Sequence, residues 1–191
     1  MRKLIVSMNV TLDGFMSGSN CELDWHFQSW NQEMSESLAQ QLSNADTILM
    51  GRITYKAMAQ YWASSVSDPF FPREDLPFAD MMNTHSKIVF SKTLKKANWN
   101  NSKLINGNIE FEIAHLKYQQ GKDMIVYGSG QLVSTLIPLD LIDEYQVWIH
   151  PVILGNGNAL FKNLHDQIKM KLLGARTFSS GVVRLNYSVR S

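Results

Sequence analysis

Glycine, arginine and threonine follow an apolar run of the sequence in an order suited to binding a phosphate. The run is Ile48–Met50, and Gly51, Arg52 and Thr54 come directly after it. Glycine lets the backbone approach a ligand closely, and arginine can form a forked pair with a phosphate. A threonine hydroxyl can cap a helix or hydrogen-bond to a phosphate oxygen. Taken alone, this junction could equally be a turn with a surface arginine.

Two further segments share this layout, with phosphate-compatible residues directly after an apolar run. Ser91 and Lys92 follow the run KIVF. Gly128, Ser129 and Gly130 follow the run DMIVY, where exposed backbone N–H groups would suit a pyrophosphate. The segment GSGQLV is an incomplete dinucleotide fingerprint, because valine stands where a third glycine is expected. The three junctions together favour a nucleotide as the ligand.

Strands and helices must flank these junctions, and the hydrophobic pattern predicts both. In an open α/β sheet, ligands bind beyond the carboxyl ends of the strands, where helix N-termini present N–H groups. A helix is predicted at 31–44, because Met34, Leu38 and Leu42 are spaced four residues apart. Three further helices are predicted to begin near Thr54, to begin near Gln131 and to cover 109–118, and a shorter helix is predicted to end near Thr84. Strands are predicted at 3–10, 46–51, 87–91, 102–105, 123–128 and 145–153.

The C-terminal part changes from this alternation to two strands. The segments 169–178 and 182–190 flank the turn SSG, which predicts an antiparallel hairpin. The fold class is therefore predicted as α/β, with a mostly parallel central sheet and a C-terminal antiparallel hairpin. The second hairpin strand alternates between an apolar face of Val183, Leu185, Tyr187 and Val189 and a polar face that includes Arg184 and Arg190. The apolar face could complete the core of one chain or pair with a second copy.

Composition limits the possible functions. The chain has 191 residues, of which 45% are hydrophobic and 18% charged, and this suits a single domain spanning 1–191. A formal net charge of +1 gives no reason to expect nucleic acid or an anionic membrane as a partner. Cys21 is the only cysteine, and the five histidines show no metal-ligand spacing, so no metal is expected. No run reaches the roughly 20 apolar residues of a membrane span, and we expect a cytoplasmic protein.

Five segments, in this order and at these spacings, resemble the dihydrofolate reductase-like superfamily: MNVTLDGFM, ILMGRITYKAM, VFSKTL, IVYGSGQLVSTLI and HPVILGNGNALF. The closer similarity is to the pyrimidine reductase of riboflavin biosynthesis, the C-terminal domain of a bifunctional deaminase-reductase. The resemblance covers nearly the whole chain and implies a three-layer fold, an NADPH-dependent reductase activity and a homodimer. The deaminase half of that enzyme has no counterpart here.

The resemblance also assigns a cofactor site. It implies that the Gly-Arg-x-Thr segment at 51–54 contacts the adenosine phosphate end of NADPH. It implies that residues 91–92 form a second phosphate-contacting strand end. The glycine turn at 128–130 matches the turn that approaches the cofactor pyrophosphate.

The catalytic acid and one substrate loop are open to two interpretations. Asp13 or Asp24 could donate the proton that accompanies hydride transfer, although an aspartate before glycine is often a turn residue. The loop that contains Gly155 and Gly157 could close over the substrate or form a plain connection.

Aromatic residues mark a departure from the folate enzymes. Trp25, Phe27 and Trp30 could form a flat wall against a substrate ring, or they could belong to the core. Trp30 stands where dihydrofolate reductases proper carry the acid that supports protonation, so folate is a poor substrate candidate.

Two functions follow from these observations. The favoured one is NADPH-dependent transfer of hydride to a small heterocycle, such as a ribosylated aminopyrimidine of the 5-amino-6-(5-phosphoribosylamino)uracil kind. The alternative is a nucleotide- or drug-binding protein on the same fold without efficient catalysis.

Overall fold

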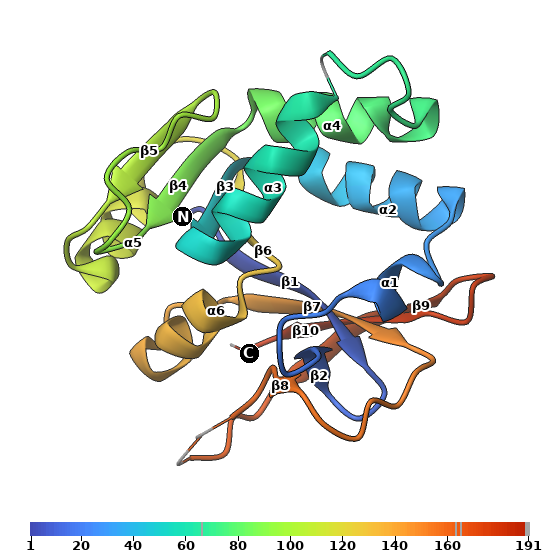
Figure 1. Cartoon of the computed structure of the whole chain (residues 1–191). Helices are drawn as coiled ribbons and strands as arrows, with labels where there is room; N and C mark the ends of the chain where they lie inside the picture. Colours follow the sequence, from blue (N-terminus) through green and yellow to red (C-terminus); the bar gives the residue numbers. More distant parts are fainter. Residues whose placement is uncertain (66, 163, 165, 190–191) are drawn as a thin grey trace.

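A mostly parallel sheet runs through the centre of the molecule (Figure 1). The computed structural model describes residues 1–65, 67–162, 164 and 166–189. Across this described part the sheet has eight strands in the order β5-β4-β3-β6-β1-β7-β10-β9. The strands are β1 Leu4–Thr11, β3 Ala45–Gly51, β4 Ser86–Phe90, β5 Ser102–Ile105, β6 Asp123–Tyr127, β7 Glu144–His150, β9 Lys171–Thr177 and β10 Val183–Ser188.

Strand direction divides the sheet into a parallel part and an antiparallel end. Every neighbouring pair from β5 to β7 is parallel. Strand β10 is antiparallel to both of its neighbours, β7 and β9. These pairings confirm the predicted fold class and the C-terminal hairpin. Arg190, placed at the end of the predicted hairpin, lies outside the described residues.

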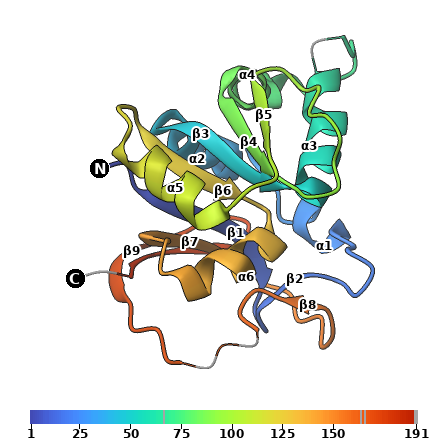
Figure 2. The same cartoon turned by 90° about the vertical axis from the view of Figure 1, so that its left-hand side faces the viewer.

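Helices cover both faces of the sheet and complete three layers (Figures 1 and 2). One face carries α2, α3 and α4, and their apolar residues form a buried cluster with one set of alternating strand residues. The other face carries α5 and α6, whose apolar residues pack against the opposite set. The helices are α2 Gln32–Ser43, α3 Arg52–Ser64, α4 Leu76–Thr84, α5 Ile109–Tyr118 and α6 Gly130–Leu136.

Predicted helix boundaries agree with the structure to within about two residues. Asn31 caps α2, and its side chain accepts a hydrogen bond from the Met34 N–H at 3.0 Å. Helix α3 begins at Arg52, two residues before the predicted start at Thr54. After α6 the chain tightens into a short 3-10 turn that contains Pro138.

Besides the short 3-10 turn after α6, four short elements escaped prediction. They are α1 Asp24–Phe27, β2 Phe15–Ser17, β8 Asn158–Ala159 and a 3-10 turn at Arg73–Asp75. Strands β2 and β8 pair with each other in a separate two-stranded sheet. Each of these elements has too few residues to show a hydrophobic periodicity in the sequence.

The two faces of β10 are not simply a core face and a solvent-exposed face. Arg184 on the polar face lies over the Trp148 ring at 5.2 Å and donates a hydrogen bond to the Ser37 hydroxyl of α2 at 2.9 Å. On the apolar face Val183 and Leu185 remain half-buried. Helix α2 therefore covers the polar face, while the apolar face is partly open.

A fully buried lysine caps the end of α4. The Lys87 ammonium donates hydrogen bonds to the carbonyls of Met82, Asn83 and His85 at 2.8–3.1 Å. It also lies 4.5 Å from the centre of the Trp99 ring. Burial lowers the pKa of Lys87 to about 8. These contacts satisfy carbonyls that the helix itself leaves unpaired.

No helix in the part of the chain that the structure describes is long and apolar enough to cross a bilayer.

Candidate functional site

Side chains tie together the turns that follow β3 and β6. The Gly51 N–H, at the end of β3, donates a hydrogen bond to the Ser129 hydroxyl at 2.8 Å. The Thr54 hydroxyl donates to the Gly128 carbonyl at 3.1 Å. Ser129 is only 3% exposed, so its hydroxyl is a fixed part of the structure. Because β3 and β6 are parallel neighbours, both turns lie at the same edge of the sheet.

The start of α3 has the properties of an anion site. No side chain caps this helix, and its first turn contains no acidic residue. The first N–H groups of a helix lack intrahelical partners and carry the positive end of its dipole. Arg52 is exposed, and it makes no hydrogen bond or ion pair with another described residue. Gly128 faces this helix with a left-handed φ of +59°, a conformation that favours glycine.

Gly130 has a packing role beside its predicted role in cofactor binding. A Cβ at this position would overlap the terminal methyl group and sulfur of Met16, which belongs to β2. The missing side chain therefore makes room for Met16, and Gly130 can reach a cofactor only through its backbone.

Ser91 and Lys92 lie beside the first junction. Phe90 is the register partner of Gly51, so the two residues that follow Phe90 are next to the start of α3. The Ser91 hydroxyl accepts hydrogen bonds from the N–H groups of Thr93 and Leu94 at 3.2 and 2.9 Å. Ser91 thus stabilises its own turn, whereas the exposed Lys92 has no partner among the described residues.

The Asp13 carboxylate accepts hydrogen bonds from two separate segments of the chain. The Thr11 hydroxyl donates to it at 2.6 Å, and the N–H groups of Leu154 and Gly155 donate at 3.3 and 2.7 Å. The Thr11 hydrogen bond, followed by the backbone N–H groups, lowers the pKa of Asp13 below its usual value. Asp13 is therefore ionised at neutral pH, a state that cannot donate a proton. Its geometry agrees with the turn interpretation.

The loop with the two predicted substrate glycines is pinned to β2. Gly155 has a φ of +72°, and a Cβ at Gly157 would overlap the Ser17 carbonyl oxygen. The Asn158 side chain donates to the Ser17 hydroxyl at 3.0 Å and to the Gly18 carbonyl at 2.8 Å. These contacts favour a structural connection, and the role of this loop in substrate binding stays a prediction.

The three aromatic residues that were predicted to form a flat wall lie in different environments. Trp25 is 4% exposed, whereas Phe27 is 65% exposed. Trp30 is half-buried and packs against the core beside α2. Asp24 is exposed in the first turn of α1. Of these three aromatic residues, only Trp25 is buried.

Two histidines beside Trp25 were missed by the sequence analysis. His150 is the last residue of β7 and is fully buried, and its Nε2 lies 2.9 Å from the Asn9 side-chain oxygen. The rings of His26 and His150 are 5.2 Å apart. A histidine at the end of the apolar run YQVWIH is the one signal that could have indicated this cluster.

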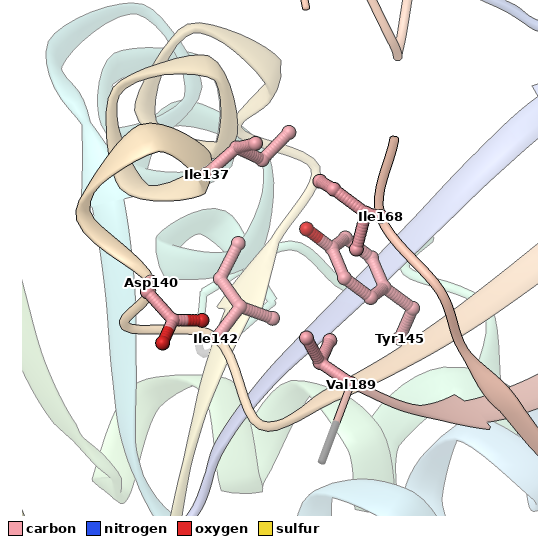
Figure 3. Close-up of a pocket in the computed structure, with 6 residues that line it drawn as sticks. All are labelled: Ile137, Asp140, Ile142, Tyr145, Ile168 and Val189. Atoms are coloured by element: carbon pink, nitrogen blue, oxygen red, sulfur yellow. The ribbon is translucent and has the colours of Figure 1, made fainter. Parts of the chain in front are cut away.

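Two hollows lie away from these junctions. Ile137, Ile142 and Tyr145 enclose a cavity of about 70 Å³ together with Asp140, Ile168 and Val189 (Figure 3). A groove of about 600 Å³ is lined by residues that include Asp46 and Lys122, at the amino ends of β3 and β6. Neither hollow contains a residue of the candidate site. No three metal-ligating side chains come together among the described residues.

The parallel sheet, its antiparallel end and the linked turns at its carboxyl edge define a reductase-like fold of the dihydrofolate reductase-like class. The chain belongs to the RibD C-terminal domain family, which it matches over residues 2–184.

Relatives and solved structures match nearly the whole chain. It is 38% identical to the uncharacterized protein YyaP of Bacillus subtilis (strain 168), with 97% of this chain and 94% of YyaP covered. A putative riboflavin biosynthesis protein from Shewanella sp. PV-4 shares 19% identity with a TM-score of 0.74, over 97% and 98% of the two chains. A deaminase/5-amino-6-(5-phosphoribosylamino)uracil reductase from Thermotoga maritima shares 13% identity with a TM-score of 0.65, over 98% of this chain and 56% of that one.

Proposed function

We propose that the protein is an NADPH-dependent reductase that transfers hydride to a small heterocyclic substrate. The observation that carries this proposal is the linked pair of turns, in which Gly51 bonds to Ser129 and Thr54 bonds to Gly128. Two helix N-termini, a left-handed glycine and the unpaired Arg52 meet there. These groups fit a dinucleotide phosphate, because N–H groups and a guanidinium are the donors that phosphate oxygens accept.

Strand β1 supplies the neighbouring part of the site. Among the described residues, it pairs with β6 only as far as Ser7, and from Met8 to Thr11 its only strand partner is β7. The edge of β1 that faces the glycine turn therefore has no strand partner along these residues. When bound, the nicotinamide ring would supply the hydride, and the protein would position the ring and the substrate.

Cofactor preference follows from the charges at the phosphate end. Arg52 and Lys92 are exposed cations at neighbouring strand ends, without partners among the described residues. A 2′-phosphate would gain two charge-assisted contacts that a hydroxyl cannot make. We propose that NADPH is preferred over NADH for this reason.

The substrate proposal rests on the family. A ribosylated aminopyrimidine, similar to the 5-amino-6-(5-phosphoribosylamino)uracil named for the Thermotoga maritima protein, is the first candidate. The alternative, a nucleotide- or drug-binding protein without efficient catalysis, is favoured by one observation. Asp13 is held as a carboxylate by Thr11 and two backbone N–H groups, so no protonated acid is evident there.

Steady-state NADPH oxidation tests the proposal. Aminopyrimidines, pteridines and other heterocycles would be supplied to the protein, and absorbance at the nicotinamide band would be followed. We expect NADPH to bind and at least one heterocycle to be turned over. Tight NADPH binding without any turnover would support the binding-protein alternative, and absence of NADPH binding would contradict the reductase proposal.

We also propose a homodimer formed through the β9–β10 end of the sheet. Strand β9 is the outer strand, and Leu172 and Leu173 are each 52% exposed. Leu172 lies opposite Tyr187 in register, on the face that helix α2 leaves uncovered. An exposed apolar strand at a sheet edge favours pairing with another chain.

Light scattering at micromolar concentration tests the dimer. We expect about twice the chain mass of 21.8 kDa, and a Leu172→Lys variant should shift toward the monomer. Lys171→Ala, at the exposed neighbouring position, is the control. A mass of 21.8 kDa for the unmodified chain, unchanged by NADPH, would rule the dimer out.

A further inference from the structure

Basic residues are concentrated in two segments of the chain that contain no acidic residue. One segment, 47–67, holds two basic residues, and the other, 81–109, holds five lysines. The formal net charge of the whole chain is only +1, so the remaining segments are net acidic. Lys87 is buried, and Lys103 lies on the outer strand β5. The other five cations are exposed and define the basic surface: Arg52, Lys56, Lys92, Lys95 and Lys96.

The loop that follows β4 runs along helix α3 and brings the two segments together (Figure 2). Because β3 and β4 are parallel neighbours, the loop begins beside the start of α3. It contacts the same helix again at Trp99, whose backbone N–H donates a hydrogen bond to the Tyr55 hydroxyl at 2.8 Å. Lys95 and Lys96 lie in the loop between these two contacts. They therefore extend the positive charge of α3 away from the linked turns.

No carboxylate of the described residues pairs with the basic surface. Its five side chains form no hydrogen bond or ion pair with any residue that the structure describes. The next acidic residues along the chain stand in the first turn of α5, which packs on the opposite face of the sheet. Arg52 and Lys56 are one helical turn apart, and Lys95 and Lys96 are adjacent, so both pairs are closer than the Debye length of about 10 Å at 0.1 M salt. The basic surface is therefore a region of positive potential on a chain of nearly zero net charge.

The proposed phosphate contacts account for only part of this charge. Arg52 and Lys92 follow β3 and β4 closely and supply the contacts proposed with the 2′-phosphate. Lys56 lies one helical turn beyond Arg52, and the two loop lysines lie further along the chain from the strand ends. Clustered like charges repel each other, and no contact within the described chain compensates this repulsion. A positive region around a binding site raises the rate at which an anionic ligand arrives.

A dinucleotide fits this surface better than a nucleic acid strand does. The basic surface is continuous with the linked turns, because Arg52 belongs to both. It is confined to one helix and one loop, and the net acidic segments outside it would repel an extended polyanion. NADPH is short, and a phosphate monoester such as its 2′-phosphate adds a charge of about −1.5 to −2 at pH 7.

We propose that the basic surface attracts NADPH over a distance and directs it to the linked turns. Lys95 and Lys96 act before the cofactor is bound and make no contact with it afterwards. They therefore raise the association rate constant and leave the dissociation rate constant unchanged. The inference rests on the proposed function, because its ligand is the proposed cofactor.

Stopped-flow mixing with NADPH measures both rate constants, with the change in nicotinamide fluorescence as the signal. At about 10 mM ionic strength the Debye length is about 30 Å, and Lys95→Glu/Lys96→Glu should lower the association rate constant by about tenfold or more. At about 1 M salt the Debye length is about 3 Å, and the variant should differ from the unmodified chain by less than about twofold. The dissociation rate constant should change by less than about twofold at either salt concentration. NADH lacks the 2′-phosphate and should show a smaller effect on association.

A second charge reversal, Lys162→Glu/Lys169→Glu, changes the net charge by the same amount elsewhere and is the control. Both of these lysines are exposed and have no bonding partner among the described residues. Lys169 lies two residues before β9, at the opposite end of the sheet from β5. The control should lower the association rate constant by less than about twofold at low salt, because its charges are far from the linked turns.

Several results would overturn the inference. One is an association rate constant that is equal in the two reversed variants, or that does not fall with salt in the unmodified chain. A change confined to dissociation would make Lys95 and Lys96 direct contacts of the bound cofactor. Binding of a DNA or RNA oligonucleotide that competes with NADPH, and that is lost in Lys95→Glu/Lys96→Glu, would identify nucleic acid as the partner instead.

An equilibrium titration with NADPH on the same samples separates the two proposals. If NADPH binds and its association rate does not depend on these charges, only this inference fails. If NADPH does not bind at any salt concentration, the proposed function fails together with it.

Discussion

Replacing Arg52 by alanine should separate cofactor binding from folding. The side chain is exposed and has no bonding partner among the described residues, so its removal should change the free energy of unfolding by less than about 0.5 kcal/mol. Its expected partner is a phosphate of NADPH. Hydrogen bonds to a charged group contribute about 1.5–3 kcal/mol, which corresponds to a loss of about 10- to 100-fold in NADPH affinity.

The assay is a titration of the unmodified chain and of Arg52→Ala with NADPH and with NADH. NADH affinity should fall much less, because NADH lacks the 2′-phosphate. Lys56→Ala removes a positive charge one turn further along α3 and controls for general electrostatics. Raising the salt concentration should reduce the preference for NADPH in the unmodified chain, because exposed charge pairs are screened. Equal losses for both cofactors, or an equal effect of Lys56→Ala, would refute the role of Arg52.

Three further predictions address stability and substrate choice. Lys87→Met leaves three carbonyls at the end of α4 without their donor, and it should lower the free energy of unfolding by about 2 kcal/mol or more in urea at pH 7; a change below about 0.5 kcal/mol would contradict the capping role. Burial lowers the pKa of His26 to about 4 from 6.5, so its contribution to stability is complete above pH 6.5 and is lost as the pH falls toward 4. The loss between pH 7 and pH 5 should therefore be about 2 kcal/mol smaller in His26→Phe than in the unmodified chain, and equal losses would count against this pKa. Dihydrofolate should be turned over poorly or not at all if, as the resemblance implies, Trp30 stands where the folate enzymes carry their acid; efficient steady-state oxidation of NADPH with dihydrofolate would contradict this and require another proton donor.

Elements with a long and regular pattern could be predicted from the sequence. Helix α2 follows from the four-residue spacing of Met34, Leu38 and Leu42, and its start follows from the capping side chain of Asn31. The three phosphate-compatible junctions meet at one edge because β4, β3 and β6 are adjacent parallel strands. The bonds that link them, such as Gly51 to Ser129, join residues distant in sequence and leave no local signal.

Short elements held by tertiary contacts could not be predicted. Strands β2 and β8 depend on contacts such as that of Asn158 with Ser17, and α1 depends on ring packing against β7. The helix that covers the polar face of β10 could not be predicted either, because alternation shows two faces without showing which one a helix covers. Contact of Arg184 with Trp148 and Ser37 places that face under α2.

NMR can locate the bound cofactor on the protein. A ¹⁵N-labelled sample would be titrated with NADP⁺, and the backbone amide signals would be followed. If the cofactor binds at the linked turns, saturable shifts will be largest at Gly51, Gly128 and Gly130, at the carboxyl ends of β3 and β6. No shifts at millimolar NADP⁺, or shifts confined to the opposite groove around Gly121 and Lys122, would contradict it.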